Sequence, residues 1–480
     1  MAMASFYRTF TEERPGFDAK NRKPGNTISH MKNLTYLLSA LILLATATVR
    51  SQDQDKPAES AKPAAADPFV QKEEAKQSKA APESKKAAPD KVTNVGTIFQ
   101  YIDVKRERWQ KWLSENSVPL DAAPLRREVE TWIKAGDANL AETSLVMGKS
   151  GQRSKVESIR EVRYPSEFDS DKSGLPVPTA FELKNQGTTS EVDPVIGLEG
   201  RIDFNFAPER VAYSGENPPR EESGAEDGDV RWPLFRSQRV ISQVSLAPEE
   251  WALIGCESSL DGEESHQTLI FARPALHQFE DKPVKSNPGG EAMLTFQWLE
   301  VGHDQLNGWL MNAGDVSAWI GGGLNTKALE AGAKILDERV MRFRSGQRVK
   351  NESIEEVIYP TEYVRDAEGK NFATPTANET RNVGLTVEVD PVLGANGGVL
   401  ELNMAPEQGF HFGESVHHRF LDGGKWLPNI TMPVFYTMKT TTQITLPLET
   451  PILVSVMSPP DENGVIDSSR KVLLFVKFSY

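Results

Sequence analysis

Three of the seven histidines lie close together, and this is the first pattern in the chain that could do chemistry. His411, His417 and His418 occur in the segment FHFGESVHH. Imidazole nitrogens bind zinc where three or four ligands converge, usually with cysteine or carboxylate partners at a regular spacing. Neither a cysteine nor a His-Glu-x-x-His pattern accompanies these histidines. We therefore predict a solvated loop here and no metal ligand.

Two pairs of carboxylates have a spacing that could support general acid–base catalysis. They are Glu191 with Asp193, and Glu388 with Asp390. Residues two apart in a strand share a face, so each pair could present two carboxylates side by side. That face is the polar one, however, and a proline follows each pair. The pattern therefore predicts a turn.

The remaining reactive residue types form no catalytic pattern. The single cysteine, Cys256, follows the apolar run Ala252–Gly255, which is typical of a small hydrophobic residue in a strand. The glycines at 321–323 lack a following Lys-Ser/Thr and are interpreted as a hinge before a helix. No Gly-x-Ser-x-Gly segment is present. We predict no catalytic residue, no cofactor-binding residue and no metal ligand, and hence not an enzyme.

Four tryptophans could instead form a sugar-binding platform. Packing is the default interpretation of Trp298, Trp309, Trp319 and Trp426, because they fall at core-type positions or turns. The formal net charge of −14 argues against nucleic acid as a partner, since a phosphate backbone needs a basic face.

The beginning of the chain has the pattern of an export signal. From Met31, a basic residue is followed by the apolar run 37–45 and then by Ala-Thr-Ala at 45–47. This order is typical of a secretory signal peptide, and the apolar run is short for a membrane span. We predict a leader over residues 1–52. Residues 53–92 are rich in Ala, Lys, Pro and Glu, which predicts a disordered tether.

An internal repeat determines the predicted domain organisation. The segment SGQRSKVESIREVRYPSEF at 150–168 matches SGQRVKNESIEEVIYPTEY at 345–363. Further matches keep the same order: FQYIDV at 99–104 with FQWLEV at 296–301, and EVDPV at 191–195 with EVDPV at 388–392. Such repetition indicates one structural unit used twice. We predict two tandem modules, at 93–280 and 292–480.

Each module is expected to begin with an alternating strand and a pair of helices. The helices are predicted at 105–116 and 125–135 in the first module, and at 303–312 and 326–336 in the second. Later segments alternate apolar and polar residues, as in Leu385, Val387 and Val389, which indicates strands with one buried face. Asp390-Pro391 and the glycines of 394–398 mark a turn between two of them. The predicted fold class is α+β, mainly β, with mostly antiparallel strands.

Both modules, 93–280 and 292–480, resemble the secretin homology region, the membrane-channel half of a bacterial secretin, and four segments of the second module carry the resemblance. They are ALEAGAKILDERVMRFRSGQRVKNESIEEVIYPTEY, ETRNVGLTVEVDPVLGANGGVLELNMAPE, PVFYTMKTTTQITLPLETPILVSV and KVLLFVKFSY. The YPTEY and APE elements are similar to those of secretin-related proteins of the type II and III secretion class in Verrucomicrobia and Planctomycetes. The Val-Pro-x-Leu-Gly-x-Ile-Pro gate segment of the family is not present; SPPDENGVID at 458–467 stands in its place.

The resemblance implies a multimeric β-barrel of the outer membrane that contacts other parts of a secretion or pilus machine. On this hypothesis the chain is an exported structural or accessory component of a type II secretion or type IV pilus system, in the periplasm or outer membrane. Its partners would be envelope proteins and other copies of itself. The alternative is a soluble periplasmic module that reuses the fold to bind a carbohydrate or a protein.

Overall fold

The computed structural model describes residues 91–170, 176–216, 232–284, 290–313, 316, 319–365, 373–422 and 425–480. The chain divides into two units, 1–82 and 83–480, and the described residues all belong to the second. The predicted leader and most of the predicted tether therefore lie outside the described residues. The last two tether positions, Lys91 and Val92, already belong to a strand. The described unit is mainly antiparallel β with few helices, which confirms the predicted fold class.

An eight-stranded antiparallel sheet combines strands from the first half of the unit, residues 91–280, and the second half, residues 291–480. Its order is β12-β11-β19-β18-β2-β1-β10-β9. The first half contributes β1 (Lys91–Lys105), β2 (Ala138–Lys149), β9 (Ala252–Ser258) and β10 (His266–Glu280). The second half contributes β11 (Glu291–Gly302), β12 (Lys334–Arg344), β18 (Ile452–Met457) and β19 (Arg470–Ser479).

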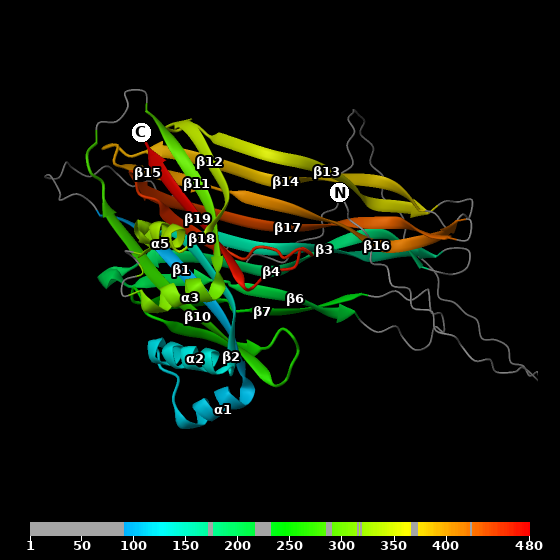
Figure 1. Ribbon diagram of the computed structural model, residues 1–480, viewed down its shortest axis with the longest axis horizontal. Coiled ribbons are helices and arrows are strands. Elements are labelled where there is room, and N and C mark those ends of the chain that lie inside the picture. The colour runs from blue at the N-terminus through cyan, green and yellow to red at the C-terminus, as the bar shows by residue number, and fades with distance from the viewer. Residues whose placement is uncertain are drawn as a thin grey trace, which may run out of the picture. The chain divides into compact units, whose positions relative to one another are not determined.

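An eleven-stranded sheet also contains both halves, and its strands run in a different direction from those of the eight-stranded sheet (Figure 1). Its main path is β13-β14-β15-β17-β3-β4-β5-β8, with β16, β6 and β7 attached beside it. The first half contributes β3 (Ser154–Ser170), β4 (Pro176–Ile196), β5 (Ile202–Phe206), β6 (Glu209–Glu216), β7 (Pro233–Arg239) and β8 (Ser242–Leu246). The second half contributes β13 (Val349–Arg365), β14 (Ala373–Leu393), β15 (Val399–Met404), β16 (Glu407–Asp422) and β17 (Lys425–Pro447).

Alternating and continuous apolar strands occupy different places in these sheets. In β5, Ile202, Phe204 and Phe206 are buried while the residues between them are partly exposed, which is the pattern of a strand with one face in the core. By contrast, β1 and β2 are buried along nearly their whole length. Continuous burial indicates that both faces are covered.

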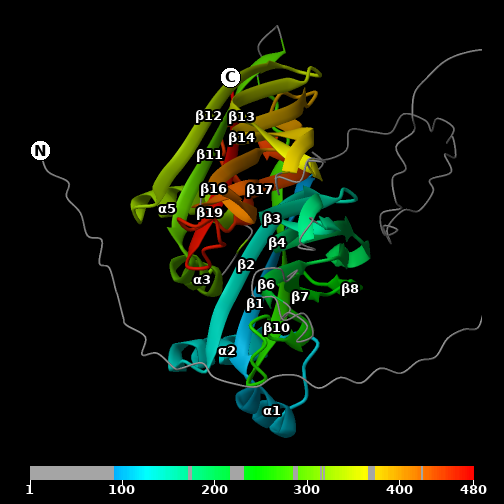
Figure 2. The same cartoon turned by 90° about the vertical axis from the view of Figure 1, so that its right-hand side faces the viewer.

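Four helices lie against the eight-stranded sheet, and Figure 2 shows α2, α3 and α5 on the side away from the eleven-stranded sheet. Their bounds are α1 Arg106–Glu115, α2 Ala123–Ala135, α3 His303–Asn312 and α5 Leu324–Glu330, with short 3₁₀ and π turns at Leu198–Gly200 and Trp319–Gly323. The helix predicted at 326–336 was wrong at its end. It stops at Glu330, because Gly332 has a positive φ of 82° and the next residues enter β12.

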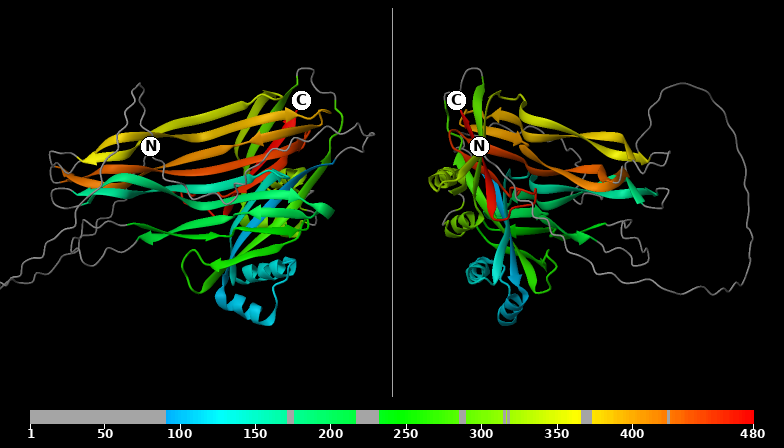
Figure 3. Two further views of the ribbon diagram at one scale, coloured as in Figure 1. Left: turned by 180° about the vertical axis from the view of Figure 1, so that it is seen from behind. Right: turned by 45° about the vertical axis from the view of Figure 1, so that its right-hand side comes forward.

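The strand order of the first half is repeated in the second half. The view from behind shows strands of the second half, yellow to red, beside cyan and green strands of the first (Figure 3). In the eight-stranded sheet, β12-β11-β19-β18 is followed by β2-β1-β10-β9. Corresponding glycines also occupy corresponding places: Gly187 lies opposite Ile159, and Gly384 lies opposite Ile354. Both have φ near 120° (129° and 118°), and a Cβ on either would lie within 2.2 Å of a backbone carbonyl oxygen in the neighbouring strand. Only glycine fits this local geometry without strain.

The turn predicted at Asp390-Pro391 lies instead inside β14. Pro391 is paired with Leu402 of β15, and the chain reverses only after Leu393, where Gly394 donates a backbone hydrogen bond to Val399. The remainder of the prediction, a turn at 394–398, is confirmed.

Candidate functional site: the inner seam

The two halves join through strand pairs that belong to different halves, and we call this junction the inner seam. In the eleven-stranded sheet, β17 pairs with β3 over seven residue pairs, from Phe435 opposite Glu161 to Thr441 opposite Lys155. In the eight-stranded sheet, β18 pairs with β2 at Ser455–Val146 and Val456–Leu145. The inner seam therefore continues both sheets from one half into the other.

A buried ion pair lies at the inner seam. The Lys471 ammonium on β19 contacts the Glu142 carboxylate on β2, and the two side chains are 0% and 3% exposed. The Ser458 hydroxyl donates to both carboxylate oxygens, at 2.8 and 2.9 Å. Burial raises the pKa of Glu142, but the charge and hydrogen bond of Lys471, together with smaller contributions that include Arg210, outweigh burial and hold that pKa below its ordinary value. The carboxylate thus stays charged and joins β2 to the last strand of the second half.

His303, the first residue of α3, lies beside this pair. One ring nitrogen is 2.8 Å from the Thr143 hydroxyl of the first half, and the other is 2.8 Å from the Ser468 carbonyl of the second. Burial, together with the nearby Lys471 ammonium, lowers the pKa of His303 to about 3. The neutral imidazole therefore bridges the two halves at ordinary pH.

A second buried network joins the helices of the two halves. Arg126 on α2 donates to the Gln100 side chain at 2.9 Å and to the Asn307 side chain on α3 at 2.9 Å. Arg126 also pairs with Glu130 at 3.1 Å, and Asn307 donates to the same carboxylate at 3.1 Å. Every strongly polar group in this network has a partner, which is the condition for burying such groups at low cost.

Nearer the surface, two ion pairs cross the inner seam. Lys149 of β2 lies 2.7 Å from Glu401 of β15. Arg381 of β14 lies 2.7 Å from Glu161 of β3, and it also contacts Glu407 of β16 at 3.3 Å. Lys439 of β17 reaches the same Glu407 at 2.8 Å.

The polar groups of the inner seam have a structural role. A serine hydroxyl, an ammonium and a carboxylate can form a nucleophilic site when a substrate reaches them. Here Ser458, Lys471 and Glu142 are all buried. Their polar atoms are directed at one another across the two halves, so the arrangement fixes the register of the seam.

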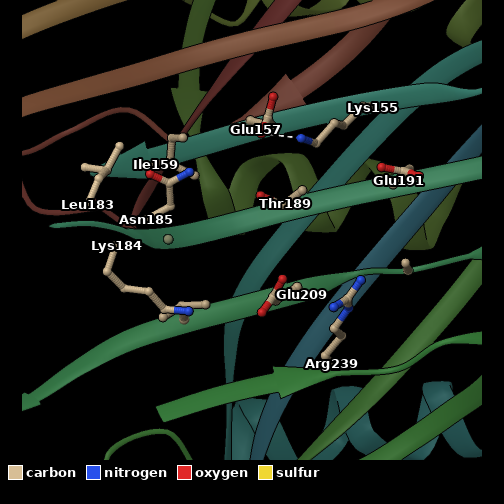
Figure 4. Close-up of a pocket in the computed structure, with 13 residues that line it drawn as sticks. Lys155, Glu157, Ile159, Leu183, Lys184, Asn185, Thr189, Glu191, Glu209 and Arg239 are labelled. Carbon is tan, nitrogen blue, oxygen red and sulfur yellow. Dashed lines mark ion pairs between the residues drawn. The ribbon is translucent and has the colours of Figure 1, made fainter. Parts of the chain in front are cut away.

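A separate polar hollow of about 430 Å³ lies between β3, β4, β6 and β7. Its charged lining includes Glu157, Lys184, Glu209 and Arg239, which come from these four strands (Figure 4). No histidine or cysteine lines it. The hollow offers charged groups to a ligand but no pair of nucleophile and base.

The histidines singled out in the sequence lie in strand β16, so the predicted loop was wrong. His411 is 3.7 Å from the Glu414 carboxylate, and the His417 ring packs edge-on against Phe181 with centroids 5.1 Å apart. Burial lowers the pKa of His417 to about 4. Among the described residues no group of three or more His, Cys, Asp or Glu side chains is placed to hold a metal.

The carboxylate pairs lie on strands, each clamped by an arginine. Asp390 and Glu388 both contact Arg348, at 2.8 Å each. Asp193 and Glu191 contact Arg153 in the same way, at 3.1 and 3.2 Å. In both halves one arginine binds both carboxylates of the pair, which is a structural reason for the two carboxylates.

The other residues singled out in the sequence are dispersed over the unit. Cys256 lies in a strand as predicted, but it is exposed at the edge of the sheet. The glycines at 321–323 form a π turn just before α5. Trp298 is buried and Trp309 packs against the core, whereas the side chains of Trp319 and Trp426 lie outside the described residues.

Sequence reasoning missed the residues of the inner seam. Lys471 and Lys477 are the charged residues of the closing segment KVLLFVKFSY, and a lysine in such an apolar strand is a signal that could have been followed. Glu142 and His303 carry no comparable signal. Their partners are far away in the sequence.

Comparisons with known proteins give limited similarity. No family model matches the chain, and no curated protein matches it. Among solved structures, the chain is similar to the secretin domain β-barrel of InvG from the Salmonella SPI-1 injectisome, at 10% identity and a TM-score of 0.21 over 48% of this chain and 70% of that one.

Two other secretin structures are similar at the same level. The type II secretion system secretin GspD of E. coli K12 gives 11% identity and a TM-score of 0.17, over 40% of this chain and 51% of that one. The V. cholerae type IV competence pilus secretin PilQ gives 8% identity and a TM-score of 0.20, over 82% of this chain and 61% of that one. The chain thus spans about half of GspD. Alignments at these values do not define a family for it.

Of the helices in the described part of the chain, none is both long and apolar enough to cross a bilayer.

Proposed function

We propose that the chain is a non-enzymatic structural subunit of the bacterial cell envelope, of the secretin type, which builds a larger assembly in a type II secretion or type IV pilus system. One observation carries the proposal. The two halves are joined edge to edge in the same strand order, and this arrangement leaves one strand edge of each half open at the two ends of both sheets.

We call these ends the outer edges. The first-half outer edge consists of β7, β8 and β9, and the second-half outer edge consists of β12 and β13. Apart from one bridge between Glu362 of β13 and Ala180 of β4, no strand pairs with them from outside in the described residues. An unpaired edge is a template for another strand. Because the two outer edges differ, copies of the chain would join head to tail, which generates a ring or a filament.

The segments that resemble the secretin homology region support the same proposal, and they extend through β12 to β19. The leader at 1–52 supports export to the periplasm or outer membrane. The protein partners of such a subunit would be other copies of itself and neighbouring envelope components.

The proposal is tested on the full-length chain by light scattering and negative-stain imaging, with and without mild detergent. We expect rings of many copies that persist in detergent. A stable monomer or dimer in both conditions contradicts the proposal and favours the soluble periplasmic module that binds a carbohydrate or protein.

A further inference from the structure

On the basis of the proposed self-assembly, we infer that the first-half outer edge of one chain pairs with the second-half outer edge of the next. We call this junction the outer seam, and its strands pair in the same register as those of the inner seam. In the inner seam, residues 435–441 of β17 face residues 155–161 of β3. By strand pairing, the counterparts of these segments are residues 235–241 at the first-half outer edge and residues 350–356 at the second-half outer edge. The partner that fits each outer edge is therefore a second copy of this chain.

An incomplete ion cluster at the first-half outer edge supports this assignment. In the second half, Arg381, Glu407 and Lys439 form a cluster that Glu161 of the first half completes. The counterparts of the first three residues are Lys184, Glu209 and Arg239, which have the same charges and surround the hollow (Figure 4).

The missing carboxylate of this cluster has a counterpart at the other end of the chain. Within the described residues, neither Lys184 nor Arg239 makes an ion pair. The counterpart of Glu161 is Glu356, an exposed residue of β13 on the second-half outer edge. Glu356 of one chain thus supplies to the next chain the carboxylate that Glu161 supplies inside each chain.

The second surface ion pair of the inner seam is also repeated at the outer edges. Its members are Lys149 and Glu401, 2.7 Å apart. The counterpart of Lys149 is Arg344, since each residue directly precedes a Ser-Gly-Gln-Arg turn. The counterpart of Glu401 is Asp203, because the two occupy the same place opposite Val392 and Val195. The charges of both partners are kept, although no contact within the described residues of one chain brings Arg344 and Asp203 together.

The same register places further opposite charges face to face. It sets Arg239 against Glu352, Arg236 against Glu355, and Glu257 against Arg339. Opposite charges directly across a strand pair stabilise it, whereas a slip by one residue would place them on opposite faces. The charge pattern therefore selects this register among alternatives.

The outer seam lacks the buried ion pair of the inner seam. The counterparts of Glu142 and Lys471 are Asp337 and Gln267. The outer seam would thus depend on exposed ion pairs, which salt screens. We expect assembly of chains to weaken as ionic strength rises, while the inner seam stays intact.

The single native cysteine allows a direct test of the register. In the inner seam Val456 faces Leu145; their counterparts are Cys256 on β9 and Val340 on β12, which is 53% exposed. Directly opposed strand residues have Cα atoms close enough for a disulfide. Under mild oxidation, the full-length variant Val340→Cys should form a ladder of disulfide-linked chains on non-reducing gels.

Two controls make the crosslink specific. Lys334→Cys places a thiol on the same exposed strand but six positions out of register, and it should give no ladder. Val340→Cys combined with Cys256→Ser removes the partner thiol and should also give none. A ladder from Lys334→Cys that equals or exceeds the ladder from Val340→Cys overturns the proposed register.

A charge exchange tests the cluster independently. Glu356→Lys should weaken self-association about tenfold, since it sets a third cation beside Lys184 and Arg239. Lys184→Glu alone should also weaken it. The double variant Glu356→Lys with Lys184→Glu should recover most of the lost affinity, measured by sedimentation velocity at low and high salt.

The outcomes separate the outer seam from the proposed function. Rings that form without the Val340→Cys ladder and without rescue by the double variant contradict the outer seam but leave the envelope assembly standing. A ladder and rescue without detergent-stable rings support the outer seam and contradict the channel-type assembly. A monomer at all salt concentrations contradicts both.

Discussion

Inside the chain, β2 and β3 meet β18 and β17 through buried polar groups, whereas at the outer edges the corresponding strands carry exposed charges. Glu142 and Lys471 are almost fully buried at the inner seam, while Arg339 and Glu352 remain partly exposed. The difference follows from connectivity. A partner within the same chain is always present, so a buried ion pair is never left alone. An open edge must remain soluble until a neighbour arrives, and exposed charge achieves this.

The largest effect is expected where the inner seam is broken from one side. Lys471→Met leaves the Glu142 carboxylate buried without its counter-ion and should lower the free energy of unfolding by roughly 3–5 kcal/mol. Urea denaturation measures this loss. The matched substitution on β10, next to the first-half outer edge, is Gln267→Met, which should change stability by less than about 0.5 kcal/mol. Equal losses from the two variants would contradict the comparison.

A smaller loss is expected from the glycines shared by the two halves. Gly187→Ala and Gly384→Ala each force a Cβ against a backbone carbonyl at positive φ, which should cost roughly 1–3 kcal/mol. The two losses should agree if the halves are built alike. Gly151→Ala, at a turn with open space around the Cβ position, should cost about 1 kcal/mol and controls for backbone conformation alone.

The inner seam should also be sensitive to acid through His303. Its pKa is about 3 in the folded protein, and about 6.5 is expected in the unfolded chain. As the pH falls, the unfolded chain therefore takes up a proton before the folded protein does. The stability contributed by neutral His303 is complete above about pH 6.5 and is lost progressively between about pH 6.5 and pH 3. At pH 5 the preferential protonation of His303 in the unfolded chain lowers the free energy of unfolding by about 2 kcal/mol.

The test is the pH dependence of unfolding in the variant His303→Gln. Its free energy of unfolding should fall less steeply between pH 7 and pH 5 than that of the native chain. A slope that the substitution leaves unchanged would contradict a lowered pKa of His303 in the folded protein. Burial lowers the pKa of His277 to about 4, so His277 should lower the free energy of unfolding as the pH falls in both proteins.

The smallest effects should come from the exposed ion pairs. Lys149→Gln removes a pair that is about one-third to one-half exposed and should cost less than about 1 kcal/mol of stability. Arg344→Gln, its counterpart, should leave unfolding unchanged within about 0.5 kcal/mol but weaken self-association. If Arg344→Gln destabilises the isolated chain more than Lys149→Gln does, the assigned correspondence is wrong.

The sequence pattern was sufficient for elements whose signals are local. The helix at 303–312 begins and ends as predicted, and Leu385, Val387 and Val389 are buried as their alternation indicated. The turn predicted at Pro391 was wrong, because a proline is tolerated in a strand where no ladder hydrogen bond is needed from its nitrogen.

The inner seam could not be predicted in the same way. Glu142 and Lys471 are separated by 329 positions, and no periodicity relates them. A polar residue in a strand has the same appearance in the sequence whether it faces water or a buried partner. The repeat revealed that corresponding residues exist, but not that β17 of one half pairs with β3 of the other.

The last strands of the chain occupy the middle of its sheets. Because β18 and β19 lie between β11 and β2, the eight-stranded sheet is not continuous until these two strands have been made, and the eleven-stranded sheet is not continuous until β17 has been made. Most contacts of the inner seam are therefore of very high contact order, which slows folding. During synthesis, the edges of β2 and β3 would stay open until β18 and β17, far downstream in the sequence, have been made. A chaperone that shields these strands, or a second chain that donates its own β17 and β18, would act in this interval.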